Sequence, residues 1–204
     1  MKAALAILLV AGPAFAFDPF EIQVYDGTAD EAGHAGLELH LNRHHDQTHV
    51  TVEPSFGVTR FWELGGYFQS AQGHYEGVKL RTKFVTPEGT VGRNLRLGIN
   101  FEVALEPGGN WGGEIRPIFA WESDRFLFAA NPNLSFPAAF EPGAMAKVKA
   151  GPIAIGLEYY GTFPDDENYL FEAIDLIAFK RLELNFAIGE GTALAAKMIL
   201  GYAF

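Results

Sequence analysis

The 204-residue sequence contains no cysteine at all. A chain without cysteine cannot form disulfides, which excludes the small, disulfide-stapled class of secreted proteins. Positive charge is also scarce, because 15 lysine and arginine residues stand against 25 aspartate and glutamate residues, for a formal net charge of −10. Nucleic-acid phosphates need a basic surface, so this balance argues against nucleic acid as a partner.

Long apolar runs are missing as well. No segment after residue 16 approaches the roughly 18 apolar residues that a spanning helix needs. The short apolar run at residues 3–11 follows Lys2 and precedes the small-residue site Ala14-Phe15-Ala16. This arrangement predicts a signal peptide at residues 1–16, cleaved after Ala16, and therefore export without a helical anchor.

The sequence is rich instead in glycine, with 23 residues, and in aromatic residues, which make up 14% of the chain. From residue 34 onward it divides into about twelve segments that alternate apolar and polar residues, each bounded by Gly, Pro, Asn or Asp. The clearest segment spans residues 93–105. Its apolar positions are Leu95, Leu97, Ile99, Phe101 and Val103, and they alternate with Asn94, Arg96, Gly98, Asn100 and Glu102.

The last twelve residues, 193–204, show the same alternation with a purely apolar face. Leu200, Tyr202 and Phe204 lie on that face, and the opposite face is small apart from Lys197. Such a strand fits a wall with lipid outside and a wetted lumen inside. The terminal Phe204, with Leu200 and Tyr202 at alternate positions before it, resembles the signal that the barrel-assembly machinery reads.

We predict an all-β fold, an antiparallel transmembrane β-barrel of about twelve strands with up-and-down topology; ten strands is the fallback. A soluble β-sandwich would alternate in the same way. The signal peptide, the strand length, the terminal aromatic residue and the aromatic residues at strand ends favour the barrel.

Three parts of the chain follow from this prediction. Residues 1–16 form the signal peptide, residues 17–33 an acidic periplasmic N-terminal lead-in, and residues 34–204 the barrel. The alternative for the lead-in is a small plug inside the lumen. An even strand number puts both ends of the barrel in the periplasm, so the odd-numbered connections are external.

Three stretches of the chain, residues 21–25, 36–42 and 156–161, resemble a group of small proteobacterial outer-membrane barrels. That group includes the proteins labelled as outer-membrane components of the meta-pathway of phenol degradation. The likeness covers most of the mature chain and lies in the residue pattern of the strands, without a catalytic signature. It implies a barrel in the outer membrane of a Gram-negative bacterium, with outer-membrane lipid and the assembly machinery as partners, that passes small organic solutes.

The inward positions of the predicted barrel carry many charges of both signs. We expect the lumen to be lined by Glu38, Glu63, Lys79, Arg81, Lys83, Arg96, Glu102, Glu114, Arg116, Lys147, Lys149, Glu158, Arg181, Glu183 and Lys197. Charges in a wall of low dielectric must be paired or hydrated. They either line a hydrated path, whose stripe of Lys79, Arg81 and Lys83 favours anions, or simply fill and stiffen a narrow barrel.

Two other chemistries have only weak sequence support. His44, His45 and His49 could hold Zn²⁺ or Cu²⁺, although a polar hairpin loop explains them as well. Ser70 lies four residues before His74, but no third catalytic residue accompanies the pair. We therefore expect no enzyme and no cofactor. The sequence favours a passive or weakly selective channel for small, organic or anionic solutes, and the alternative is a non-conducting structural or adhesive barrel.

Overall fold

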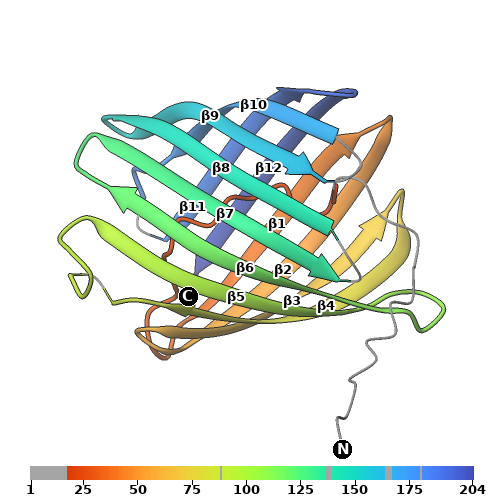
Figure 1. Cartoon of the computed structure of the whole chain (residues 1–204), viewed down its shortest axis with the longest axis horizontal. Helices are drawn as coiled ribbons and strands as arrows, with labels where there is room; N and C mark the ends of the chain where they lie inside the picture. Colours follow the sequence, from red (N-terminus) through yellow and green to blue (C-terminus); the bar gives the residue numbers. More distant parts are fainter. Residues whose placement is uncertain (1–17, 88, 137–138, 164–166, 180) are drawn as a thin grey trace, which may run out of the picture.

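The structure, a computed structural model, describes residues 18–87, 89–136, 139–163, 167–179 and 181–204 (Figure 1). The predicted signal peptide lies outside these residues. Within them, no helix is long and apolar enough to cross a membrane.

The described residues form twelve strands, as the alternation predicts. In chain order they are β1 (Ala35–His44), β2 (Gln47–Thr59), β3 (Trp62–Ala71), β4 (His74–Val85), β5 (Leu95–Leu105), β6 (Trp111–Glu122), β7 (Phe126–Phe136), β8 (Ala139–Ala150), β9 (Ile153–Thr162), β10 (Glu167–Leu176), β11 (Leu182–Glu190) and β12 (Leu194–Ala203).

The strands close into an antiparallel barrel in which each pairs with its sequence neighbours and β1 pairs with β12. The closing register runs from Gly36 opposite Ala203 to His44 opposite Ala195, and β12 also pairs with β11. This confirms the predicted all-β, up-and-down barrel of twelve strands. We call the end with the β1–β2 turn the outer end, and the end at which β1 begins the inner end.

The two faces of the wall have opposite chemistry. Most outward side chains are apolar and exposed, with Leu80 74% and Trp111 70% accessible. Many inward side chains are polar and buried, and Arg116 and Lys197 are each only 2% accessible. A soluble protein would bury the first set and expose the second, so this wall fits lipid outside and a polar interior.

Some hairpins at the outer end are tighter than the sequence predicts. Asn133, Pro142 and the Gly and Pro residues nearby indicate a long external loop at residues 133–142, but most of this stretch is strand, because β7 continues to Phe136 and β8 begins at Ala139. The turn between β1 and β2 consists of His45 and Asp46, with φ angles of 46° and 62°. Two residues with positive φ give the twist that a two-residue hairpin needs.

Residues 18–33 lie inside the barrel, where Figure 1 shows them as a red trace between the strands. The sequence predicts a periplasmic position for this segment, and the luminal plug was the alternative; the structure corrects the first in favour of the second. The physical reason is that Ile22, Val24 and Tyr25 are buried against the wall, and the acids on either side of them, Glu21 and Asp26, meet wall cations. We call residues 18–33 the plug.

Two wall glycines let the plug approach closely at the inner end. A Cβ atom on Gly57 would lie 2.3 Å from the carbonyl oxygen of Glu31 and 2.5 Å from that of Asp30. A Cβ atom on Gly36 would lie 2.9 Å from the Asp30 carboxylate. Hydrogen bonds from Gly33 to Gly57 (2.7 Å) and from Gly57 to His34 (2.9 Å) fix this contact.

Candidate functional site in the barrel lumen

The backbone of the plug is held by polar side chains of the wall. Asn131 on β7 accepts a hydrogen bond from the Tyr25 amide (2.6 Å) and donates one to the Tyr25 carbonyl (3.1 Å). Lys197 on β12 donates to the Ile22 carbonyl (2.8 Å). Thr51 on β2 donates to the Phe20 carbonyl (3.1 Å). The plug therefore spans the lumen with its main-chain polar groups satisfied by opposite sides of the barrel.

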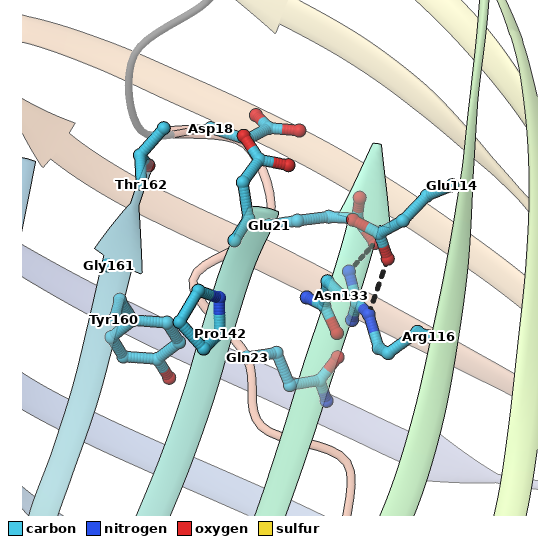
Figure 2. A pocket seen from close by; sticks show the side chains of 11 residues that line it. Asp18, Glu21, Gln23, Glu114, Arg116, Asn133, Pro142, Tyr160, Gly161 and Thr162 are labelled. Atoms are coloured by element: carbon cyan, nitrogen blue, oxygen red, sulfur yellow. Dashed lines mark hydrogen bonds and ion pairs between the residues drawn. The ribbon is translucent and has the colours of Figure 1, made fainter. Parts of the chain in front are cut away.

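At the centre of the lumen, the plug carboxylates form ion pairs with wall cations. Lys79 on β4 lies 2.6 Å from Glu21 and 3.0 Å from Asp18. Arg116 on β6 lies 3.5 Å from Glu21 and 2.6 Å from Glu114 (Figure 2). Ion pairs buried this deeply are strongly destabilised when one partner is removed, because the other charge is left uncompensated. This cluster therefore ties the plug to the wall.

The electrostatic environment keeps the plug carboxylate at this cluster ionised. Burial alone would raise the pKa of Glu21, but the positive charges of Lys79 and Arg116 outweigh the burial and hold the pKa well below its usual range. Glu21 is thus a permanent negative charge at neutral pH, facing two permanent positive charges.

A second cluster joins β2, β3 and β4. Arg81 contacts Glu53 (2.7 Å) and Glu63 (2.6 Å), and Lys83 contacts Glu63 (2.9 Å). All four side chains are nearly or fully buried. The plug reaches this cluster as well, because the backbone amide of Asp30 donates to Glu63 (2.7 Å).

A third cluster lies on the opposite side of the lumen, between β8, β9, β10 and β12. Lys147 contacts Glu158 and Asp175, each at 2.7 Å. Lys197 contacts the other oxygen of Glu158 and also Tyr160, whose hydroxyl lies 3.0 Å from the ammonium nitrogen. Glu158 is only 2% accessible, so two cations compensate one fully buried carboxylate.

The inner end of the lumen holds a fourth cluster. Arg96 donates to the backbone carbonyl of Asp26 (3.0 Å) and lies 3.4 Å from its carboxylate. Glu122 bridges Arg96 and Lys149. Asp26 belongs to the plug, and Lys197 of the third cluster donates to the plug carbonyl of Ile22, so all four clusters contact the plug.

The predicted lumen charges mostly meet in these clusters, and two behave differently. Glu183 occupies an inward position of β11 but is exposed at the inner end. The sequence predicts Arg181 among the inward charges, whereas the structure places it before β11, exposed. The strand begins one residue later than its alternation indicates, and Arg181 therefore lies in the β10–β11 connection.

Several residues of these clusters are missing from the predicted set. The plug acids Asp18, Glu21 and Asp26 were assigned to the periplasm, although the alternation of Ile22 and Val24 signalled a buried extended segment. Asp175 could not be assigned, because the acids of β10 fall on both faces. In the structure Asp175 points inward, on the same face of β10 as the buried Phe171 and Ala173. Glu172 points outward.

The free space beside the plug is small. Asp18, Glu21, Arg116, Asn133 and Glu141 are among the residues that line a cavity of about 30 Å³ (Figure 2). This volume accommodates about two water molecules. At the level of this cavity, the plug and the wall charges leave room only for water.

In the part of the chain that the structure describes, the three candidate metal-binding histidines do not bring their ligand atoms together as one group. His44 contacts the Tyr169 hydroxyl through Nε2 (2.7 Å), and its ring packs edge to face on that of His45 in the turn, with centroids 4.2 Å apart. The ring of His49 instead meets Phe20 edge to face. Among the described residues, a different set brings metal-ligand atoms together, namely Glu38, His40 and Glu53.

The terminal residues Leu200, Tyr202 and Phe204 all face outward, and each is at least 41% accessible. The rings of Tyr202 and Phe204 pack edge to face with centroids 5.1 Å apart. The amide of Phe204 donates to the carbonyl of Ala35 (2.8 Å), at the seam that closes the barrel. The predicted assembly signal is therefore an aromatic strip on the closing strand.

Fold and lumen together define the class of protein: a transmembrane β-barrel with an apolar outer wall and a charged interior. No protein family and no curated protein matches the sequence. Solved structures do match. The KdgM porin superposes with a TM-score of 0.68 at 11% identity, covering 83% of this chain and 99% of the porin. A second structure of that porin, in complex with disordered oligogalacturonate, gives 0.67 at 11% identity, with the same coverage.

The COG4313 outer membrane channel from Pseudomonas putida F1 superposes with a TM-score of 0.60 at 10% identity, covering 90% of this chain and all of the channel. At these identities the likeness establishes the fold that this chain shares with small outer-membrane barrels. It does not carry over the solutes of those proteins.

Proposed function

We propose that this protein is an outer-membrane channel for small solutes in a Gram-negative bacterium, closed by its own N-terminal segment. The observation that carries the proposal is the reversed polarity of the closed barrel, with exposed apolar residues outside and buried charges inside. The two channels with the same fold support it. Export through the signal peptide at residues 1–16 and insertion by the barrel-assembly machinery belong to the same proposal.

Conduction requires that the plug leave the lumen, because the cavity beside it holds little more than water. When the plug leaves, Lys79, Arg116 and Arg96 each lose a plug carboxylate. Each cation keeps a wall carboxylate, Glu102 for Lys79, Glu114 for Arg116 and Glu122 for Arg96, but the positive charge along this side of the path is then less fully compensated than in the closed state. A small organic solute that carries negative charge, such as a carboxylate, is the solute class that this side of the lumen would attract.

A second function, a non-conducting structural or adhesive barrel, is favoured by the plug itself. Its carboxylates are buried in ion pairs, and its backbone is bonded to several strands. A plug held this firmly would keep the lumen blocked, so that no solute could pass. The two functions differ in one property, the conductance of the barrel when the plug is absent.

The test is a planar-bilayer recording of two refolded proteins, the mature chain and a variant that lacks residues 18–30. We expect rare or no conductance steps for the mature chain and regular steps for the variant. Heat-modified migration in a denaturing gel would establish that both barrels are folded. A folded deletion variant that gives no conductance steps would contradict the channel proposal and favour the structural role.

Charge reversal tests the solute class in the same recordings. Arg81→Glu in the deletion variant removes one lumen cation and adds an anion. We expect the ion selectivity to shift toward cations, since the field in the path then changes sign locally. Unchanged selectivity would mean that ions do not pass along this side of the lumen.

A further inference from the structure

Three metal-ligand side chains meet on the inner wall between β1 and β2. His40 Nε2 lies 3.2 Å from Glu38 Oε2 and 3.2 Å from Glu53 Oε2. Glu38 and Glu53 are directly opposite each other in the register of the two strands, and His40 is two residues along β1 on the same face. His40 is fully buried, and Glu53 is 2% accessible.

We propose that Glu38, His40 and Glu53 bind a divalent first-row transition-metal ion, with zinc as the ion to test. One imidazole nitrogen and two carboxylates form a donor set that zinc accepts, and three protein ligands leave a fourth position for water. The proposal does not rest on channel function, because the three ligands belong to the wall and not to the plug.

The spacing of the donor atoms fits such an ion. Zinc binds histidine nitrogen and carboxylate oxygen at roughly 2.0–2.2 Å, so two ligand atoms in a tetrahedral site lie about 3.4 Å apart. Both distances from His40 Nε2 are close to that value. All three donor atoms lie within 4.8 Å of one another.

A proton on His40 leaves this cluster incompletely satisfied. The single N–H at His40 Nε2 can be directed at only one acceptor, and its hydrogen bond goes to Glu38. Among the described residues, Glu53 Oε2 accepts no hydrogen bond although it is buried and faces His40. A metal ion would compensate both carboxylates at once, which a single proton cannot do.

The charges around the site also lack positive partners. Three carboxylates, Glu38, Glu53 and Glu63, lie around two cations, Arg81 and Lys83. With a neutral His40, one negative charge of this group has no positive partner, and a divalent ion would compensate it.

Arg81 orients one of the ligands. Its guanidinium lies 2.7 Å from Glu53 Oε1, which leaves the other oxygen, Oε2, directed at His40. A ligating carboxylate is commonly held by such a neighbour through its free oxygen. Gln23 of the plug donates to Glu38 Oε2 (3.1 Å), so the site lies where the plug touches the wall.

The experiment measures retained metal after refolding. The mature protein is refolded from denaturant into detergent with excess zinc, which removes any barrier to entry through the closed lumen, and is then dialysed. We expect about one zinc per chain by elemental analysis, at least a tenfold loss of affinity in His40→Gln and in Glu53→Gln, and no change in His49→Gln. His49 is also a buried histidine of the inner wall and serves as the matched control.

Cobalt gives a second readout that folding alone would not change. Co²⁺ in place of zinc should produce the visible absorption of a four-coordinate site in the wild type and in His49→Gln but not in His40→Gln. Gel migration checks that every variant is folded. No retained metal in the wild type, or retention by a folded His40→Gln variant, would overturn the proposal.

Discussion

The ion pair of Glu21 with Lys79 offers the sharpest test of how the plug is held. Glu21→Gln removes the negative charge and keeps the size of the side chain. The two charged atoms are 2.6 Å apart, and the side chain of Glu21 is 3% accessible. Such a pair is screened little by solvent, so its loss should be measurable.

The expected magnitude follows from the partners that remain. Complete loss of a partner in a buried pair costs about 3–5 kcal/mol. Lys79, however, keeps Asp18 at 3.0 Å and Glu102 at 3.7 Å. The cost is therefore nearer that of one charge-assisted hydrogen bond, about 1.5–3 kcal/mol. Since about 1.4 kcal/mol is a factor of ten, the equilibrium should shift toward the displaced plug by roughly tenfold to a hundredfold.

Single-channel recording of the mature chain measures this shift as open probability. Glu190→Gln is the matched control, because Glu190 is an exposed carboxylate at the end of β11. We expect frequent openings for Glu21→Gln and wild-type behaviour for Glu190→Gln. If the deletion variant conducts while Glu21→Gln opens no more often than the wild type, this ion pair does not hold the plug, and our account of the closed state is wrong.

Three further predictions concern the plug and the closing strand. Gly57→Val should raise open probability, because the new Cβ would lie 2.3 Å from the plug carbonyl oxygen of Glu31. The expected loss in the stability of the closed state is about 1–3 kcal/mol. Val52→Ala is a control on the same strand. Because the pKa of Glu21 in the closed state is lowered from the ordinary value of 4.5, its charge stabilises the bound plug fully at any pH above 4.5. This stabilisation is lost only when the pH falls through the lowered pKa. Open probability should therefore not rise between pH 7 and pH 5. Deletion of Phe204 should reduce the amount of folded barrel in the outer membrane without changing the conductance of what assembles, as membrane fractionation and recordings would show.

Most of the wall could be predicted from the sequence, because period-two alternation is a local property. The stretch Leu95 to Leu105 alternates without interruption, and its observed faces are those that the pattern indicates. The pairing of β1 with β12 could also be predicted, because a β-sheet in a membrane cannot leave strand edges unpaired. Strand ends were less certain, as Arg181 shows, because pairing with a neighbour decides where a strand begins.

The interior was harder to predict, because its contacts join residues far apart in the chain. Glu21 is acidic and lies outside every strand, which is typical of a solvated segment. Only the position of Lys79 and Arg116 across the lumen explains its burial. In the same way, His40 is one inward residue of an alternating strand in the sequence, and only the register of β1 with β2 brings it to Glu53.

In the proposed channel, closure and solute choice depend on the same side chains. Lys79, Arg116 and Arg96 bind plug carboxylates when the lumen is closed, and each loses one carboxylate partner when it opens. A carboxylate solute can take the place of that partner, whereas a neutral solute cannot. An anionic solute that binds only the open state lowers the free energy of opening by RT ln(1 + c/Kd), where c is the solute concentration and Kd is its dissociation constant from that state. The plug therefore discriminates among solutes before any of them has passed.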